Sequence, residues 1–272
     1  MPSTFDFTTT TSTQTAVDFL AEKTGLPKAR IKDAMNKGAC WWTFKGKQVR
    51  LRRATKDLPK GTRVQLYYDE QVLARIPPAG QLMADQRRYS IWYKPHGMLA
   101  QGSQWGDHCS LLRWVELERN RECFLIHRLD ADAAGLMMIA HDSQAAALLS
   151  QLFQSRDLNK YYQARIIGEL IANNLRIDQP LDGKESVSIV NTLATSDDHL
   201  TTLVEVLIET GRKHQIRRHL SGIGHPIIGD RIYGTASKTP LQLLAYKLAF
   251  RCPISKQQIC LELPRELHLQ NC

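Results

Sequence analysis

The sequence predicts an α+β protein with a small basic module ahead of a larger domain. Its 272 residues, 43% of them hydrophobic, are enough to fill a large core. The positive charge is concentrated near the amino terminus, and a segment without sustained periodicity, stiffened by Pro77 and Pro78, separates two patterned regions. We therefore expect a flexible terminus over 1–14, a small domain over 15–68, a linker over 69–88 and a large domain over 89–272.

The first patterned region predicts two short helices followed by short strands. Apolar residues repeat at helical spacing twice, with Gly25 and Pro27 between the two runs and Gly38 after the second. The repeating residues are Val17, Leu20 and Ala21, then Ile31, Ala34 and Met35. The runs CWWTF, KQVRL and RVQLYY are rich in aromatic and β-branched residues and predict strands, with KGK and PKG as turns.

The charge of this module indicates a phosphate-binding surface. From Lys23 to Arg63 the chain carries 13 Lys and Arg against 2 Asp and Glu, whereas the net charge of the whole protein is +9. Such a local excess is typical of a protein that binds a nucleic-acid backbone. A well-solvated basic face would show the same charge, so both interpretations stay open on charge alone. Trp41 and Trp42 can stack on bases, but at least one is expected in the core.

Several classes of protein are not expected. The chain has no run of about eighteen apolar residues, so no membrane span is predicted, and its opening MPSTFDFTTTTSTQTA lacks the pattern of a secretory signal. Its six cysteines show no short paired spacing, which predicts neither a disulfide framework nor a zinc site. We expect a cytoplasmic protein that acts as a monomer.

In the larger domain, the stretch HRLDADAAGL from His127 joins two apolar runs. It predicts a tight connection between two buried strands. Asp130 and Asp132 can shape such a turn, and one of them can instead carry chemistry. From the stretch alone both interpretations remain open, and His127 can help to hold the loop or be structural.

Further elements follow in order along the large domain. SQAAALLSQLFQS predicts a helix capped by Asp142 or Ser143, and its apolar stripe is Leu148, Leu149, Leu152 and Phe153. KYYQARII predicts a strand that directs Tyr161 and Tyr162 to opposite faces, and TTLVEVLIET predicts another strand. RKHQIRRHL predicts a short helix whose exposed side is cationic through His214, Arg217 and Arg218.

Four stretches in this order carry a family resemblance: YKPHGMLAQG, HRLDADAAGL, NKYYQARIIG and GRKHQIRRHLSGIGHPIIGDRIYG. Together they resemble the pseudouridine synthases of the RluA type over nearly all of residues 89–252. The resemblance implies a mixed, mostly antiparallel central sheet with flanking helices. It also implies isomerisation of uridine in RNA, a reaction without redox change that requires no cofactor and no metal. The small module, over residues 15–68, resembles the RNA-binding module of the ribosomal-protein S-four type.

The resemblance assigns roles to particular residues. Asp130 is implied as the essential residue, a carboxylate that can form a covalent adduct; attack on the ribose, attack on the uracil ring and assistance of elimination from the sugar all stay open. Arg217 is implied as its partner, and Tyr162 as the residue that stacks on the uracil and can accept a proton from carbon-5. Leu243 is implied as an apolar wall under the base, and Arg128 as a contributor to base flipping. In the small module Lys28, Arg30, Lys32 and Lys37 are implied as phosphate contacts, which Arg50, Arg52 and Arg53 can extend. The expected partner is structured RNA, with large-subunit ribosomal RNA ahead of transfer RNA.

The chain departs from the family pattern in two places. Ala133 and Ala134 stand where the family usually has Thr-Ser, and Leu244 stands where it often has His. Loss of the two hydroxyls removes possible braces of the aspartate loop. The rival hypotheses are a non-catalytic RNA-binding or assembly protein, a hydrolase that uses Asp130 or Asp132 with a histidine, and a metal site at His214, His219 and His225.

Overall fold

The computed structural model describes residues 2–10, 14–155, 157–235 and 237–270, and they fall into two compact units. The first unit comprises residues 1–78 and 101–114, and the second comprises 79–100 and 115–272. The chain therefore passes between the units three times.

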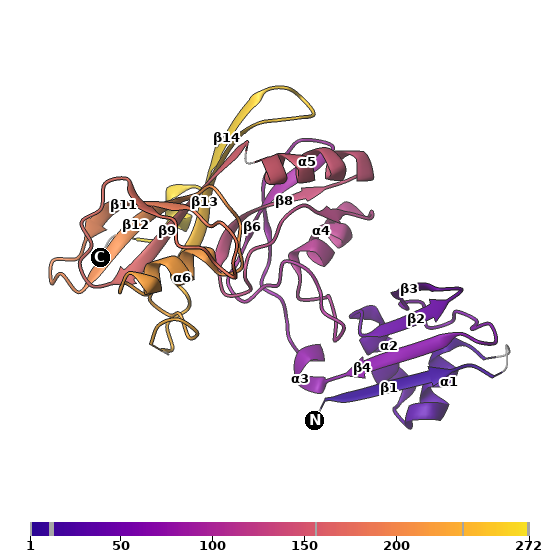
Figure 1. The fold of residues 1–272 in the computed structure, drawn as a ribbon. Coiled ribbons are helices and arrows are strands. Elements are labelled where there is room, and N and C mark those ends of the chain that lie inside the picture. The colour runs from indigo at the N-terminus through magenta and orange to yellow at the C-terminus, as the bar shows by residue number, and fades with distance from the viewer. Residues whose placement is uncertain (1, 11–13, 156, 236, 271–272) are drawn as a thin grey trace. The chain divides into compact units, whose positions relative to one another are not determined.

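The first unit contains a four-stranded antiparallel sheet of order β1-β4-β2-β3 and three helices (Figure 1). Its strands and helices are β1 Ser3–Thr8, α1 Ala16–Thr24, α2 Lys28–Asn36, β2 Cys40–Phe44, β3 Lys47–Arg50, β4 Arg63–Tyr68 and α3 Glu70–Leu73. The hydroxyl of Thr15 caps α1 by accepting from the Asp18 N–H, and Gly25 ends α1 in the left-handed conformation. Both predicted helices and all three predicted strands of this region are therefore confirmed.

The core of this unit contains the predicted apolar repeats. Ile31, Ala34 and Met35 of α2 are buried, and Trp42 packs against the same core. Trp42 thus fulfils the expectation that one tryptophan is structural. Trp41 instead lies under the guanidinium of Arg50, at 4.2 Å from the ring centroid.

Two predicted boundaries are wrong. The expected flexible terminus contains β1, which pairs with β4 over its whole length because the alternating residues of STFDFT suit an edge strand. The expected linker contains α3 and β5 Gln81–Asp85, and β5 pairs with β6 Tyr89–Lys94. Met1 and residues 11–13 of the predicted terminus lie outside the described residues.

The second unit is built on a mixed sheet of ten strands, in which β10-β11-β12-β9-β13-β8-β6-β5 are neighbours. Every described pair is antiparallel except β13 with β8, so the predicted mixed, mostly antiparallel sheet is confirmed. Helix α4, Leu111–Arg119, begins in the first unit and ends in the second. The remaining elements of the second unit are β7 Phe124–Leu125, β8 Ala134–Ala140, α5 Ser143–Ser155, β9 Leu158–Ile167, β10 Leu175–Ile177, β11 Ser188–Thr195, β12 Thr201–Ile208, α6 Gln215–Gly222, β13 Leu243–Arg251, β14 Gln258–Glu262 and the short η1 Arg265–Leu267.

One face of this sheet carries the main core. α5 packs on β7, β8 and β9, whereas α6 packs on β11 (Figure 1). Gly135 has a φ of +126°, and a Cβ there would meet the backbone oxygen of Ala245 at 2.3 Å. Only glycine therefore allows β8 and β13 to approach in parallel at this point.

No helix among the described residues is long and apolar enough to span a membrane. Among the described residues, Cys40, Cys109, Cys123, Cys252 and Cys260 are free thiols. Cys272 lies outside the described residues.

Candidate active site

The connection between β7 and β8 forms a loop that is tied by backbone hydrogen bonds. The Ala133 N–H donates to the carbonyl of Asp130 at 3.2 Å, and the Gly97 N–H donates to that of Ala131 at 2.8 Å. His96 Nδ1 lies 2.6 Å from the carbonyl oxygen of Asp132. The loop is thus held by its own backbone and by the 95–98 turn, so the missing hydroxyls at Ala133 and Ala134 do not leave it without braces.

Lys94, at the end of β6, is the central brace of this loop. Its side chain is fully buried, and Nζ donates to the carbonyls of Pro95 at 3.1 Å, Met98 at 2.8 Å and Ala131 at 3.2 Å. Burial lowers the pKa of Lys94 to about 8, against the opposing effect of the Asp130 and Asp132 charges. An ammonium with three N–H donors matches these three carbonyls.

Arg217, in α6, joins the Asp130 loop to the other half of the unit. Its Nε and Nη2 each donate to Asp230 at 2.7 Å, and Nη1 donates to Asp130 Oδ2 at 3.3 Å. Burial opposes the charge on Arg217, but the hydrogen bonds and charges of Asp230 and then Asp130 outweigh it and raise the pKa. The sequence-based placement of Arg217 on an exposed cationic side is wrong, because its side chain is 3% exposed.

Asp230 is the buried anchor of this arrangement. Its carboxylate also accepts from the backbone N–H groups of Ile232 at 2.9 Å and Tyr233 at 3.1 Å. Burial alone would raise its pKa, but Arg217 and the two N–H groups outweigh burial and lower it. Arg217 is therefore a cation held by one buried carboxylate while it presents Nη1 to another that is 31% exposed, that of Asp130.

His214 approaches the second oxygen of Asp130. It adopts the left-handed backbone conformation at the start of α6, with a φ of 54°, which is uncommon for a residue other than glycine. Its Nε2 lies 3.7 Å from Asp130 Oδ1, and its Nδ1 lies 3.0 Å from the Tyr233 hydroxyl. Burial lowers the pKa of His214, so it faces Asp130 as a neutral imidazole at neutral pH.

Tyr162 and Leu243 share a face of the sheet. Tyr162 of β9 pairs with Ala245 and Ala164 pairs with Leu243, so the pleat puts Leu243 and Tyr162 on one side. Tyr161 packs against the main core on the other side, which confirms the prediction that the two tyrosines face opposite ways. Burial, and then the Asp130 charge, raise the pKa of Tyr162 well above its ordinary range, so its phenol is protonated at neutral pH.

The other residues of the HRLDADAAGL stretch differ in role. His127 stacks on Phe153 and accepts the Met138 N–H at Nε2, and burial lowers its pKa to about 3, so it is a structural neutral histidine. Arg128 is exposed and makes no hydrogen bond or ion pair with other described residues. Asp132 lies 3.5 Å from Arg231 Nη2 and not beside Arg217.

The cations of the small unit are largely paired with carboxylates. Lys28 lies 2.7 Å from Asp18, Arg30 lies 2.5 Å from Glu70, and Lys37 lies 2.9 Å from Asp33. Arg50 and Arg52 both pair with Asp107, and Arg53 bonds Thr55. Among the predicted phosphate contacts, Lys32 alone has no such contact within the described residues, and it is exposed. The unit still carries 15 Lys and Arg against 8 Asp and Glu.

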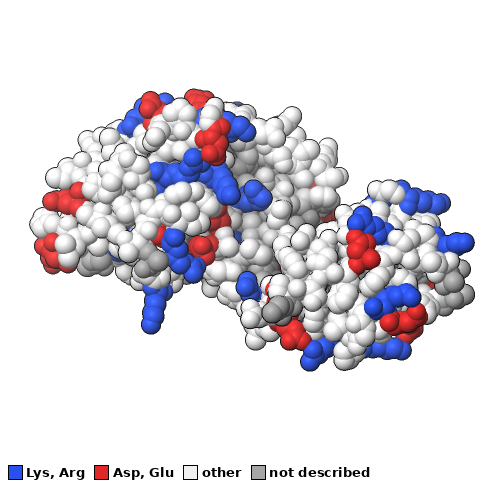
Figure 2. All heavy atoms as spheres, turned by 60° about the horizontal axis from the view of Figure 1, so that its bottom comes forward, with Lys and Arg blue, Asp and Glu red and all other residues white. Residues whose placement is uncertain are grey.

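The surface in Figure 2 shows how these charges are distributed on one face. Over the smaller unit, blue and red side chains lie next to one another, as the ion pairs require. Over the larger unit, Lys and Arg side chains gather in a band. The net positive excess lies mainly in the small unit, as the sequence predicted, but basic side chains that can meet a phosphate backbone also lie on the larger unit.

The metal hypothesis is not supported by the three histidines. His219 is buried between Ser188 Oγ at 2.9 Å and the carbonyl of Gln179 at 3.0 Å, and His225 Nδ1 lies 3.0 Å from the carbonyl of Ile167. In the described ranges, no three His, Cys, Asp or Glu side chains gather as metal ligands would.

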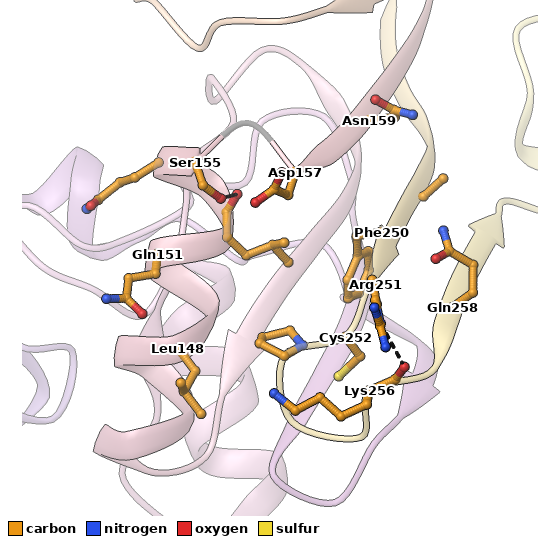
Figure 3. Close-up of a pocket in the computed structure, with 14 residues that line it drawn as sticks. Leu148, Gln151, Ser155, Asp157, Asn159, Phe250, Arg251, Cys252, Lys256 and Gln258 are labelled. Carbon is orange, nitrogen blue, oxygen red and sulfur yellow. Dashed lines mark hydrogen bonds between the residues drawn. The ribbon is translucent and has the colours of Figure 1, made fainter.

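A second hollow is separate from this site. It is an open groove lined by residues of α5, among them Gln151 and Ser155, and by Arg251 and Lys256 at the end of β13 and after it (Figure 3). It lies at the Arg251 end of β13, whereas Leu243 begins that strand. The sequence-predicted site residues do not line it.

Sequence reasoning missed three members of the site. Asp230, His214 as a neighbour of Asp130, and Lys94 as a brace all lie within the quoted motifs, in GDRIYG, RKHQ and YKPHG. Their positions in the motifs were visible in the sequence. The orientation of their side chains toward the Asp130 loop was not, because it depends on how β6, α6 and the segment after α6 converge on the loop after β7.

Comparison with known proteins identifies the family of this chain. Residues 88–222 match the family model described as RNA pseudouridylate synthase. The dual-specificity RNA pseudouridine synthase RluA of Vibrio parahaemolyticus is 33% identical over 185 residues, which cover 60% of this chain and 74% of the relative. The ribosomal large subunit pseudouridine synthase D of Xylella fastidiosa is 29% identical over 224 residues, covering 78% of this chain and 62% of the relative.

A solved structure shows the same fold. The human RNA pseudouridylate synthase domain containing 1 superposes with a TM-score of 0.59 and 19% sequence identity, over 70% of this chain and 86% of that chain. This likeness shows the fold, whereas the family model and the sequence relatives show the family: the chain belongs to the RNA pseudouridylate synthase family, of the RluA type, and is an isomerase.

Proposed function

We propose that this isomerase converts uridines of structured RNA through Asp130, and that large-subunit ribosomal RNA is its substrate ahead of transfer RNA. One observation carries the role of Asp130: its partly exposed carboxylate lies 3.3 Å from a buried arginine that another carboxylate holds in place. A nucleophilic carboxylate has to be fixed in direction, and this contact supports that.

The reaction breaks the bond between the ribose and the base nitrogen, turns the uracil and joins the ribose to carbon-5. In our proposal Asp130 forms and later releases a covalent adduct, while Arg217 holds the carboxylate in position through Nη1. No group is added and no electron is gained or lost overall.

Tyr162 and Leu243 are proposed to hold the uracil on their common face of the sheet. The raised pKa of Tyr162 means that it meets the base as a neutral phenol. It can take the carbon-5 proton only as it passes its own proton onward, and the base nitrogen freed from the ribose takes up a proton, so the isomerisation leaves the number of protons unchanged. Leu243 is 5% exposed and offers an apolar surface under the ring.

The substrate class has independent support. The small unit has a positive net charge, and its arrangement of two helices beside short strands fits the proposed RNA-binding module of the S-four type. One relative is named for the ribosomal large subunit and another as a dual-specificity synthase. The relatives are bacterial, which supports the expected cytoplasmic location, and action as a monomer stays a prediction.

The role of Asp130 is tested by replacing it with asparagine. Wild type, Asp130→Asn and Asp132→Asn are each incubated with a large-subunit ribosomal RNA transcript, and pseudouridine is detected by its carbodiimide adduct. We expect Asp130→Asn to bind the transcript normally and to form no pseudouridine, and Asp132→Asn to retain activity. Pseudouridine formation by Asp130→Asn would refute the proposal, and release of free uracil by the wild type would indicate a hydrolase.

The substrate is tested in cells. Pseudouridines are mapped across total RNA from a deletion strain, its parent, and the strain complemented with wild type or Asp130→Asn. We expect sites in large-subunit ribosomal RNA that vanish in the deletion and return only with the wild type. Loss confined to transfer RNA would reverse the proposed order of substrates, and unchanged sites in every RNA would contradict the substrate claim.

A further inference from the structure

Ile232 is exposed within a segment whose neighbouring side chains are all directed toward the active site. Asp230 binds Arg217, Arg231 lies 3.5 Å from Asp132, and the hydroxyl of Tyr233 lies 3.0 Å from His214. Between them, the side chain of Ile232 is 60% exposed. The neighbours of Ile232 thus contact residues around Asp130, whereas the apolar side chain of Ile232 itself is exposed to solvent.

The backbone of Ile232 is fixed by the same network. Its N–H donates to Asp230 Oδ1 at 2.9 Å, and that oxygen also accepts from Arg217 Nη2 at 2.7 Å. The Tyr233 N–H donates to the same oxygen at 3.1 Å. A side chain on such a support loses little freedom when it meets a ligand, which favours binding.

Exposure alone does not single out Ile232, since scattered apolar residues are normal on protein surfaces. Leu200 is 65% exposed and Ile171 is 88% exposed in the same unit. These two residues lie near the β11–β12 turn and in the connection after β9, away from the Asp130 loop in the sheet order. Ile232 differs from them in its position. It lies beside the candidate active site, where the target uridine of the proposed RNA substrate has to leave its base stack.

A base that turns out of RNA leaves the face of its neighbour exposed to water. Proteins that distort nucleic acids often place an apolar side chain against such a face, and contacts of this kind do not depend on base identity. We propose that Ile232 packs against the nucleobase next to the target uridine in the substrate RNA, and so stabilises the flipped state.

This inference rests on the proposed function and adds a substrate contact to it. The charges around Ile232 suit the backbone that flanks such a base. The side chain of Arg231 is 66% exposed, and Arg128 is exposed on the neighbouring loop. An apolar contact for one base, next in the chain to an exposed guanidinium that can meet a phosphate, matches single-stranded or distorted RNA better than an acidic or apolar partner.

The test compares two RNA probes under single-turnover conditions. One is a transcript in which the mapped target uridine lies in its native helix, and the other is a short transcript in which the same uridine is unpaired. We expect Ile232→Ala to slow pseudouridine formation by about tenfold on the structured transcript and by less than about twofold on the unpaired one. Ile232→Leu, which keeps an apolar side chain, is expected to restore the rate on the structured transcript.

Leu200→Ala is the matched control, because Leu200 has similar exposure and lies outside the site. It should match the wild type on both transcripts. Equal rates for Ile232→Ala and wild type on the structured transcript would overturn the inference and leave the proposed function intact. So would an equal loss on both transcripts. A wild type that forms no pseudouridine on either transcript would overturn both.

Discussion

Asp230 holds Arg217 through both of its carboxylate oxygens, at 2.7 Å each, and leaves only Nη1 of the guanidinium for Asp130. The stronger of the two ion pairs is thus between residues that are both buried, and the weaker one reaches the partly exposed carboxylate. Arg217 is a fixed support on which Asp130 rests, and Asp130 keeps one oxygen free of it.

The first prediction concerns removal of this support. Asp230→Ala leaves the buried guanidinium of Arg217 with only its longer contact to Asp130, so we expect the free energy of unfolding to fall by about 3–5 kcal/mol. The measurement is chemical denaturation. Asp182→Asn, which breaks the surface pair with Arg218, is the control and should cost less than about 1 kcal/mol. Equal losses for the two variants would contradict the structural role of Asp230.

The second prediction concerns Lys94. Lys94→Met leaves three carbonyls without their buried donor, and we expect a loss of about 3 kcal/mol in stability together with a slower reaction. Thermal unfolding and single-turnover rates measure the two effects. Lys247→Met, at a lysine that pairs with Glu262 on the surface, serves for comparison. A stable Lys94→Met enzyme with an unchanged rate would show that the loop does not need this brace.

The third prediction concerns acid. Folded His127 stays neutral down to about pH 3, whereas the unfolded histidine takes up a proton near 6.5. Between these values the unfolded state binds more protons, so lowering the pH destabilises the fold. Relative to His127→Gln, the free energy of unfolding of the wild type should fall by about 2 to 3 kcal/mol more between pH 7 and pH 4.5. His199→Gln, at an exposed histidine, should behave like the wild type, and parallel curves for all three would refute this account.

The fourth prediction concerns the small unit. Lys32 is exposed without a partner in contact, whereas Lys28 is paired with Asp18. Lys32→Gln should weaken RNA binding and reduce the slope of log affinity against log salt by about 1. Asp18→Asn, which releases Lys28, should change the slope in the opposite direction. Filter binding at salt concentrations between about 50 and 200 mM measures both slopes and resolves a change of about 1. If both variants gave the slope of the wild type, this face of the small unit would be excluded from RNA binding.

Local patterns predicted most helices and strands because their signals lie within a few residues. SQAAALLSQLFQS became α5 and KYYQARII became most of β9 with little change of bounds. β1 escaped prediction although Phe5 and Phe7 alternate with polar residues, because its stability depends on β4, which lies more than fifty residues away.

The site was predictable as a set of motifs and not as a geometry. The order of the motifs pointed to Asp130 and Arg217, which the structure brings to 3.3 Å. The burial of Arg217 was not visible, since one short helix carries apolar Ile216 and Leu220 beside three basic side chains. Which side of that helix faces inward is decided by β11 and by Asp230, and neither is local to it.

The segment 101–114 belongs to the first unit although it lies within the sequence of the second. Its Asp107 receives Arg50 and Arg52, and a Cβ on Gly38 would meet Asp107 Oδ1 at 2.4 Å. Deleting residues 1–78 would therefore not yield a clean catalytic fragment, because a buried carboxylate would lose its two cations inside the remaining chain. The first unit is completed by residues 101–114, which are translated after the first strands of the second unit. A single cut in the gene therefore cannot separate the two units.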